Sequence, residues 1–484
     1  MCFNTSYVLL LCILNLAGST VTHVVVTARV YADSSGAFAE IPALLTAGGP
    51  LTPLLDYCLH HHHDRSQSWI RKLIHAVGLL LDYIEANPFE EEPWRLFRNF
   101  AQRLYTGTFD IQNGIDPSNL CWSPKGWQSA AYTIRLLSEF FDWLGATNPS
   151  ANAINPKYAG SAYDRRIDEA GYLYRRNKAF LGHTWAENPG QADAGRLTRN
   201  KRLPRVTKGE PPEFPHDRFE ELLFKGFRVG GKYDYRGMLI TLLMHGAGFR
   251  VSEPFHLYVS DVHPDPSDPA SALVLIHHPS AGAAPADWRS ALGKPMQGNR
   301  AAYLGAKWAM TPRTMLIGRD HAGWKNPLLD GEYYMRAWWF DPVYGKWFLQ
   351  LWQRYMREVA MVDRNHPFAF INLDRDPVGD MYCIEAFTKA HEAAVRRIGL
   401  DYGKQYGTTP HGHRHSYAQR LRRGSVDKLN VKRFLHHCAL ESQEPYTQPT
   451  TAESIAALQA ASQRMRESTS DVALPEHLTL LGED

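Results

Sequence analysis

The segment from Thr408 to Tyr446 carries the side chains in this sequence that are best suited to phosphate chemistry. His411 and Arg414 stand three residues apart, so both lie on one face if the segment is helical. Arginine holds phosphate oxygens well because its guanidinium is planar and permanently charged. A tyrosine hydroxyl has a pKa of about 10, so a nearby base, here His411 or His437, must activate it as a nucleophile. The segment therefore predicts attack of Tyr446 on a phosphodiester.

A second arginine stands where two predicted helices meet. The stretch 239–261 reads as an apolar helix that ends at Gly246 or Gly248, then Arg250, then a second apolar helix closed by Asp261. The glycines let the backbone turn, so we expect Arg250 at a helix junction rather than on a solvated face. It would complete a clamp of two arginines for the oxygens of one phosphate.

Four sequence boxes resemble those of the tyrosine recombinases, the phage-integrase family. GAGFRVSEPFHLYVSDV resembles the first-arginine box, and HGHRH resembles the His-x-x-Arg box. Leu435-His436-His437 stands where the family usually has Leu-Gly-His, and Tyr446 follows His437 at the spacing of the family's nucleophile. The long spacer with its Arg-rich and Trp-rich insertion most resembles the gamma-mobile-trio branch of mobile-element recombinases.

The resemblance implies a mainly α fold with a small β-sheet: an N-terminal helical core-binding domain, which clamps DNA, and an integrase-type α+β catalytic domain. It implies a site-specific recombinase that cuts and rejoins DNA through a 3′-phosphotyrosine at Tyr446. Arg250 and Arg414 would hold the phosphate, with His437 as a further donor, and His411 would handle the tyrosine proton.

The same resemblance predicts the partners of the chain. Phosphodiester energy is conserved in the covalent link, so neither a cofactor nor a metal is expected. Strand exchange implies a homotetramer on two double-stranded DNA sites, with accessory proteins from the same mobile element. We expect a cytoplasmic, nucleoid-associated bacterial protein with no membrane role.

The family also has a short hairpin whose turn carries a lysine that protonates the leaving 5′ oxygen. Here the corresponding stretch is long and irregular, and Lys294, Lys307 and Lys325 compete for the role. We favour Lys325, because Gly323–Pro327 is turn-like and precedes the strand-like Met335–Phe340.

The length and the net charge of the chain limit the number of domains and the kind of DNA binding that we expect. A chain of 484 residues predicts two or three domains, and the net charge of only +3 means that DNA affinity must come from local clusters. The six cysteines form no Cys-x-x-Cys pair, so neither a disulfide scaffold nor a zinc site is indicated. An apolar run at Tyr7–Ala17 resembles a signal-peptide core but no Lys or Arg precedes Arg29, so we interpret it as a spurious start extension rather than a secretion signal.

The pattern along the chain predicts six segments: a leader-like extension (1–22), a strand-and-turn segment (23–65), the helical core-binding domain (66–147), a basic linker (148–213), the catalytic domain (214–450) and a C-terminal helix and tail (451–484). Within the first domain we expect helices at Ser66–Ala86, Glu92–Tyr105 and Pro124–Leu144. The basic linker is expected to contact phosphates through Arg165, Arg166, Arg175, Arg176, Arg199, Lys201 and Arg202.

Two other functions fit the same residues. A type IB topoisomerase uses similar Arg, Lys, His and Tyr chemistry but relaxes supercoils as a monomer. A regulator of the same fold that has lost catalysis would bind DNA without forming an adduct.

Overall fold

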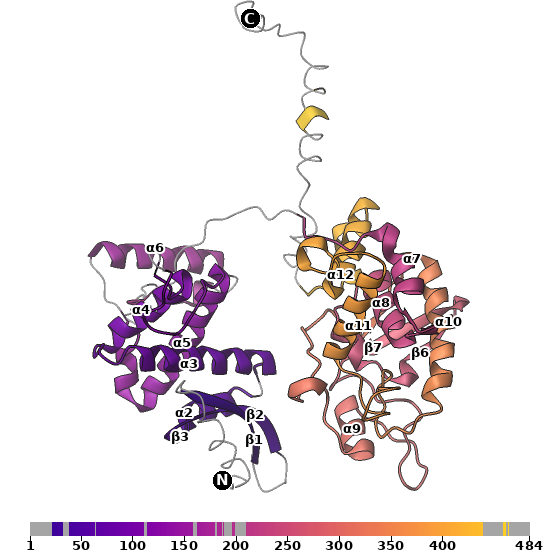
Figure 1. Cartoon of the computed structure of the whole chain (residues 1–484), viewed down its shortest axis with the longest axis horizontal. Coiled ribbons are helices and arrows are strands. Elements are labelled where there is room, and N and C mark those ends of the chain that lie inside the picture. The colour runs from indigo at the N-terminus through magenta and orange to yellow at the C-terminus, as the bar shows by residue number, and fades with distance from the viewer. Residues whose placement is uncertain are drawn as a thin grey trace, which may run out of the picture. The chain divides into compact units, whose positions relative to one another are not determined.

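The computed structural model divides the chain into two compact units, Met1–Arg205 and Val206–Asp484 (Figure 1). It describes residues 22–31, 38–62, 64–110, 114–157, 162–179, 182–185, 187, 196–198, 210–438, 458–460 and 463. The first unit is mostly helical, and the second combines helices with small antiparallel sheets. The expected class, mainly α with a small β component, is therefore confirmed.

The N-terminal unit begins with an antiparallel sheet in the order β1-β2-β3. β1 (His23–Tyr31) pairs along its whole length with β2 (Phe38–Thr46), while β3 is only Gly49–Pro50. The strand-and-turn segment expected at 23–65 also contains a helix, α2 (Thr52–His60). Proline is compatible with a helix start, where its missing N–H is not needed, and Pro53 occupies that place in α2.

Three longer helices follow, α3 (Gln67–Ala86), α4 (Pro93–Thr106) and α5 (Trp127–Thr147). They pack on each other, and α3 also packs on the sheet. Their bounds lie within a few residues of the prediction. Ser66 caps α3 by accepting a hydrogen bond from the Trp69 backbone N–H at 3.3 Å. Their shared core is rich in aromatic rings, including Phe97 and Phe100, both 0% exposed.

The segment expected to be a basic linker contains regular structure. A 3-10 helix, η2 (Pro149–Ala153), is followed by α6 (Ala162–Lys178) and by η3 (Gly182–Thr184). The run of basic residues led us to interpret this stretch as a linker that contacts phosphates, but α6 buries Tyr172, which packs on Trp185. The described residues up to 198 therefore belong to the N-terminal unit.

In the C-terminal unit, α8 (Tyr235–Ala247) is buried on all sides from Gly237 onward, so it forms the centre of the core. α10 (Pro342–Val359), α11 (Ile384–Arg397) and α12 (Pro410–Arg423) pack around it. The entry to the unit consists of short elements: η5 (His216–Arg218), α7 (Phe219–Glu221), the π-helix η6 (Leu222–Gly226), and a small hairpin of β4 (Arg228–Val229) and β5 (Lys232–Tyr233).

A three-stranded antiparallel sheet, β6 (Val262–Asp265), β7 (Asp268–His277) and β8 (Tyr334–Arg336), lies against α10. The predicted second apolar helix after Arg250 was wrong: the chain forms two 3-10 turns, η7 (Glu253–His256) and η8 (Val259–Asp261). The connection between β7 and β8 is a long insertion with α9 (Arg300–Trp308) and η9 (Gly318–Asp320). It has its own small core around Trp288, Tyr303 and Leu304.

After α12 come α13 (Lys428–Phe434) and a short segment to Cys438, and η10 (Lys404–Tyr406) precedes α12. Some parts of the predictions lie outside the described residues: Tyr446, the apolar run at Tyr7–Ala17 and most of the C-terminal helix and tail expected at 451–484. Among the helices that the structure describes, none combines the length and apolarity needed to cross a bilayer.

Candidate active site

Arg250 lies just beyond the end of α8, at the helix junction that the sequence predicts. Gly248 ends the helix with a φ of +72°, and a Cβ there would lie 2.4 Å from Cδ1 of Tyr417, so only glycine fits. Arg250 is then fixed by the fully buried Glu253, whose carboxylate accepts from the Arg250 backbone N–H at 2.7 Å and from Nη1 at 2.8 Å. The hydrogen bonds to Glu253 thus fix the orientation of the Arg250 guanidinium before any ligand binds.

Arg414 lies on the first turns of α12 and is 1% exposed. Its Nη1 donates to the carbonyl oxygen of Gly248, and its Nη2 donates to the carbonyl oxygen of Leu435 at 2.7 Å. Nη2 also lies 2.8 Å from Nε2 of His437. One buried guanidinium therefore connects three of the four sequence boxes.

His437 is 3% exposed, and its ionisation follows from its contact with Arg414. A guanidinium can only donate, so Nε2 of His437 accepts and the ring proton of the neutral imidazole lies on Nδ1. Burial first, and then the positive charges of Arg414 and Arg250, lower the pKa of His437 to about 3. His437 is therefore neutral at physiological pH.

His411 begins α12 with an exposed side chain whose ring meets that of His415 edge-on at 4.4 Å. Its pKa is lowered to about 4, first by desolvation and then by the charges of Arg414, Lys325, Arg250 and Lys404. Four cations thus act on one imidazole, although they come from four separate parts of the chain. A neutral His411 can accept a proton.

Lys325 is exposed, and its charge acts on His411, so it lies beside the site. Its loop is tied to the His437 segment, because the Leu328 backbone N–H donates to the carbonyl of His436 at 3.0 Å. The two rival lysines lie in the insertion. Lys294 follows the turn of an exposed hairpin whose base is the bridge between Arg289 and Pro295.

Lys307, the third candidate, ends α9 and lies over the rings of Tyr303 and Trp308, 5.5 and 5.4 Å from their centroids. The structure thus brings Arg250, Arg414, His411, His437 and Lys325 together, which are five of the six residues expected to carry chemistry. The sixth, Tyr446, lies outside the described residues.

His436 occupies the position where the resembled family usually has glycine. Its φ of +52° lies in the left-handed region that glycine adopts without strain. The ring is buried and stacks on Phe249, with centroids 5.4 Å apart. The stacking contact with Phe249 stabilises His436 in a backbone conformation that is unfavourable for a residue with a side chain. Leu435 and His437 therefore contact Arg414 although a histidine stands between them.

Sequence reasoning missed two charged residues of the site. Glu253 neutralises and orients Arg250, and its position three residues after Arg250 on the same turn was a usable signal. Lys404 adds positive charge beside His411, but it begins η10, before α12, where no spacing rule points to it.

The basic residues expected to contact DNA through the linker are only partly described. Arg166 and Arg175 are exposed on α6, and Arg176 is half-buried with its Nε donating to the carbonyl of Gly182 at 3.1 Å. The side chain of Arg165 lies outside the described residues, as do Arg199, Lys201 and Arg202.

A second basic surface, which we did not predict from the sequence, lies on α4. Its exposed face carries Arg95, Arg98, Asn99, Gln102 and Arg103. Of the described α-helices in the N-terminal unit, α4 is the one without an Asp or Glu between its bounds. The side chains of Arg98 and Arg103 form no hydrogen bond or ion pair with other described residues.

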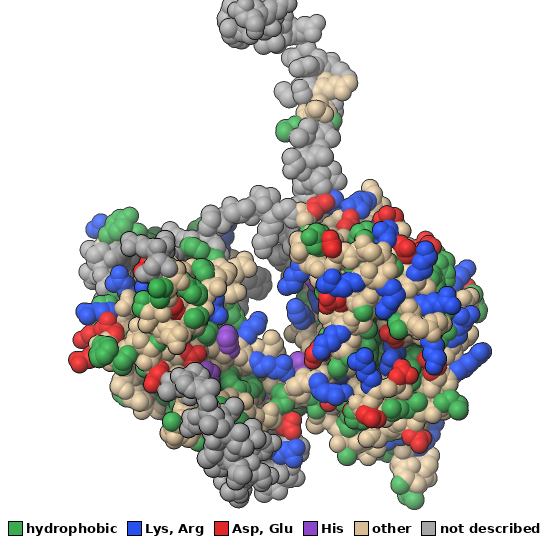
Figure 2. All heavy atoms as spheres, viewed as in Figure 1, with side chains coloured by type: hydrophobic (Ala, Val, Ile, Leu, Met, Phe, Trp, Pro, Cys, Tyr) green, Lys and Arg blue, Asp and Glu red, His purple; other side chains and the backbone are tan. Residues whose placement is uncertain are grey.

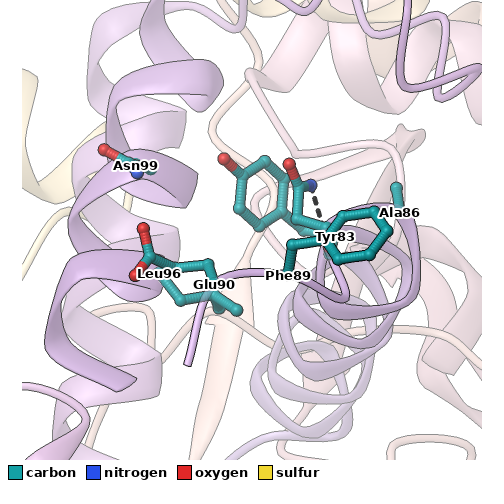
Figure 3. A pocket seen from close by; sticks show the side chains of 7 residues that line it. Tyr83, Ala86, Phe89, Glu90, Leu96 and Asn99 are labelled. Atoms are coloured by element: carbon teal, nitrogen blue, oxygen red, sulfur yellow. Dashed lines mark hydrogen bonds between the residues drawn. The ribbon is translucent and has the colours of Figure 1, made fainter. Parts of the chain in front are cut away.

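Two adjoining hollows of about 310 and 500 Å³ lie between the end of α3 and α4. Figure 3 shows Tyr83 and Ala86 from α3 lining the smaller one, opposite Asn99 on α4. Gln102 and Arg103 line the larger one. The hollows are polar and open, and they lie in the unit that does not contain Arg250 and Arg414.

No group of three or more His, Cys, Asp or Glu in the described part of the chain could hold a metal ion.

No family model matches the sequence, and no curated protein matches it. Among solved structures, the XerH site-specific recombinase bound to its difH substrate is 15% identical, covers 79% of this chain and 96% of its own, and has a TM-score of 0.34. XerA recombinase is 13% identical over 86% of this chain and 98% of its own, with a TM-score of 0.30. The Tn1549 transposon integrase in complex with circular intermediate DNA is 14% identical over 80% and 99%, with a TM-score of 0.32. These values are too low to assign a function, which must be argued from the site.

Proposed function

We propose that this chain breaks and rejoins DNA strands at a phosphodiester held between Arg250 and Arg414. One observation carries the proposal: the Arg414 guanidinium donates to the carbonyl oxygen of Gly248, two residues before Arg250, and contacts His437. In agreement with this contact, the charges of both arginines act on His411 and on His437. Two guanidiniums that share two neighbours can share one phosphate. Fixed donors of this kind stabilise the negative charge that grows on the non-bridging oxygens during attack.

The reaction then follows from the remaining groups. The hydroxyl oxygen of Tyr446 attacks phosphorus while its proton passes to His411. The bond to the 5′ oxygen breaks, and Lys325 protonates that oxygen as it leaves. The product is a 3′-phosphotyrosine and a free 5′ hydroxyl, and attack by another 5′ hydroxyl reverses the steps and restores both proton carriers.

The ionisation of the histidines supports these roles. A pKa of about 4 leaves His411 neutral at physiological pH, so it has a lone pair for the tyrosine proton. His437 keeps its proton on Nδ1 because Nε2 accepts from Arg414, so Nδ1–H is the atom that can donate to a phosphate oxygen.

In its finer form, the proposal is a site-specific recombinase or integrase of a mobile element, of the gamma-mobile-trio type, that acts as a homotetramer on two DNA sites with accessory proteins. The sequence boxes support this form, since four occur in the order and local spacing of that family. A type IB topoisomerase and a silent regulator remain the competing functions, and they differ from it in measurable products.

DNA would be bound by exposed cations as well as by the site. In the N-terminal unit, α4 and α6 present exposed arginines, which suit phosphate contacts that are salt-dependent and independent of sequence. Figure 2 shows many Lys and Arg side chains on the face of the C-terminal unit turned to the viewer. We propose these surfaces as the DNA-contact regions, with Arg165, Arg199, Lys201 and Arg202 retained as candidates.

The test is covalent trapping. Nicked duplexes covering the DNA that flanks the gene are incubated with the full chain, and adducts are mapped by mass spectrometry. The wild-type protein should form a 3′ adduct at Tyr446, and Tyr446→Phe should bind DNA without forming one. Tyr406→Phe, which changes an exposed tyrosine before α12, is the matched control and should still form the adduct.

Each competing function gives a different result. Relaxation of supercoils by a monomer without joining of partner sites would favour the topoisomerase. Binding without an adduct would favour the regulator. An adduct that survives Tyr446→Phe would move the nucleophile to another residue.

A further inference from the structure

Four histidines connect the entry of the C-terminal unit to its centre. Nδ1 of His216 lies 3.2 Å from Nε2 of His245, and Nδ1 of His245 lies 3.2 Å from Nδ1 of His413. Nε2 of His413 lies 2.8 Å from Nε2 of His391. His216 is exposed, whereas the other three rings are 0% exposed. We call these four residues the histidine chain.

Three members of the histidine chain lie on three helices next to the proposed site. His245 is on α8, five residues before Arg250, and His413 is on α12, immediately before Arg414. His391 is on α11 and contacts His413 from the other side.

Aromatic rings hold two of the imidazoles in plane. Phe219 stacks on His245 at 3.7 Å between centroids, and Phe214 stacks on His413 at 4.3 Å. The rotation of α12 about its axis, which decides where Arg414 points, is therefore set partly by the ring of His413.

The hydrogen bonds between the four imidazoles determine which nitrogen of each ring carries the proton. Each neutral imidazole has one N–H and one acceptor nitrogen, so all protons in a linear chain point the same way. Nδ1 of His391 has no hydrogen-bond partner among the described residues. A buried N–H without an acceptor is rarer than an acceptor without a donor, so Nδ1 of His391 is the acceptor left over. His391 Nε2–H therefore donates to His413, His413 Nδ1–H donates to His245, and His245 Nε2–H donates to His216.

We propose that the histidine chain is a positioning device that sets α12 against α8 so that Arg414 and Arg250 face one phosphate. This inference rests on the proposed function and adds residues that none of the four sequence boxes assigns a role. Apolar side chains would fill the same buried space with less desolvation, whereas directional hydrogen bonds define one rotation of the helix. Arg420 adds a second link between the helices, because its Nη2 donates to the carbonyl of His245.

The test uses the inner end of the histidine chain, where two substitutions separate hydrogen bonding from packing. His391→Gln keeps an N–H donor near the position of Nε2, and His391→Leu removes it. His366→Leu is the matched control, because His366 is 1% exposed in the same unit and lies outside the histidine chain. For each full-length variant we would measure DNA affinity, the rate of adduct formation at saturating DNA, and thermal stability.

We expect His391→Leu to slow adduct formation about tenfold with unchanged DNA affinity, since misplacing a reacting group by about 1 Å can cost up to about a hundredfold. His391→Gln should recover most of this rate, and His366→Leu should leave it unchanged. A full rate in His391→Leu would overturn the proposal. Equal losses in His391→Leu and His391→Gln would also overturn it, because packing alone would then explain them.

A measurement without DNA separates this inference from the proposed function. Imidazole ¹⁵N spectra should show His413 neutral with its proton on Nδ1, and a proton on Nε2 would contradict the direction of the chain. Absence of any adduct in the wild-type protein would instead refute the proposed function.

Discussion

The two units present arginine in opposite ways. In the C-terminal unit, Arg414 is 1% exposed and its guanidinium donates to two backbone carbonyls, so its position is fixed before DNA arrives. In the N-terminal unit, Arg98 and Arg103 on α4 are exposed and form no hydrogen bond or ion pair with other described residues. Burial fixes a charge for chemistry at one phosphate, whereas exposure leaves charges that can follow a DNA backbone.

The histidines differ between the units in the same way. The C-terminal unit buries many imidazoles, and burial lowers the pKa of His391, His436 and His437 to about 3. In the N-terminal unit, burial also lowers the pKa of His75 on α3. Desolvation raises the pKa of Asp116 there, but hydrogen bonds outweigh it and lower the pKa to about 2. With more such imidazoles, the C-terminal unit should lose more stability as the pH falls below about 6.5.

The largest expected effect is acid unfolding of the C-terminal unit at a higher pH than the N-terminal unit. An imidazole with a folded pKa below about 6.5 binds its proton more readily when unfolded, so the stability it contributes is lost as the pH falls from about 6.5 toward 4. Each such imidazole costs about 1.4 kcal/mol per pH unit over that range. The Asp116 contribution is lost only below about pH 4, the usual carboxyl range.

Hydrogen exchange of the full chain, read by mass spectrometry, measures both units in one experiment. Between pH 6.5 and 4, protection should fall in α8, α11 and α12 while it persists in α3, α4 and α5. Loss of protection in both units at one pH would contradict the difference drawn between them.

The next effect is on catalysis at the buried arginine. Arg414→Ala should lower the rate of adduct formation about a hundredfold to a thousandfold, as expected when one fixed donor to a developing negative charge is removed. It should also lower the melting temperature, because the carbonyls of Gly248 and Leu435 lose their donor. Arg396→Ala, which changes an exposed arginine paired with Glu392 on α11, should change neither quantity.

The choice among three lysines gives a smaller effect. Lys325→Ala should slow adduct formation about a hundredfold, because general acid catalysis contributes about that much, whereas Lys294→Ala and Lys307→Ala should cleave normally. A substrate with sulfur in place of the leaving 5′ oxygen needs no protonation and should restore the rate of Lys325→Ala. A loss confined to Lys294→Ala would transfer the role to the hairpin in the insertion.

The smallest effect belongs to the exposed arginines of α4. Arg98→Ala and Arg103→Ala should each weaken DNA binding and reduce the slope of log affinity against log salt by about 1, since each removes about one phosphate contact. The cleavage rate at saturating DNA should stay unchanged. A lower cleavage rate at saturation would place α4 closer to the chemistry than we propose.

Much of the candidate site could be predicted from local spacing. The three-residue step from His411 to Arg414 predicted a shared helix face, and α12 contains both. The glycines before Arg250 predicted a junction, and Gly248 adopts the left-handed conformation. Such signals operate within one or two turns, where sequence distance and spatial distance agree.

The contacts that join the boxes could not be predicted in this way. His245 and His413 are 168 residues apart and meet only because α8 and α12 pack together. The insertion between β7 and β8 was also unpredictable, because Tyr303, which packs on Trp288 inside the insertion, also packs on Tyr258 outside it. The helix α2 within the expected strand-and-turn segment could not be predicted from Pro53, because proline is common both in turns and at helix starts.

The most direct measurement is a structure of the Tyr446→Phe protein bound to the DNA that the wild-type protein traps. Guanidinium nitrogens of Arg250 and Arg414 should lie about 2.7–2.9 Å from non-bridging oxygens of the same scissile phosphate, as charge-assisted hydrogen bonds do. The ring of residue 446 should face that phosphorus from the side opposite the 5′ oxygen. If the two arginines contact different phosphates, or if Arg250 contacts only Glu253, the proposed site is contradicted.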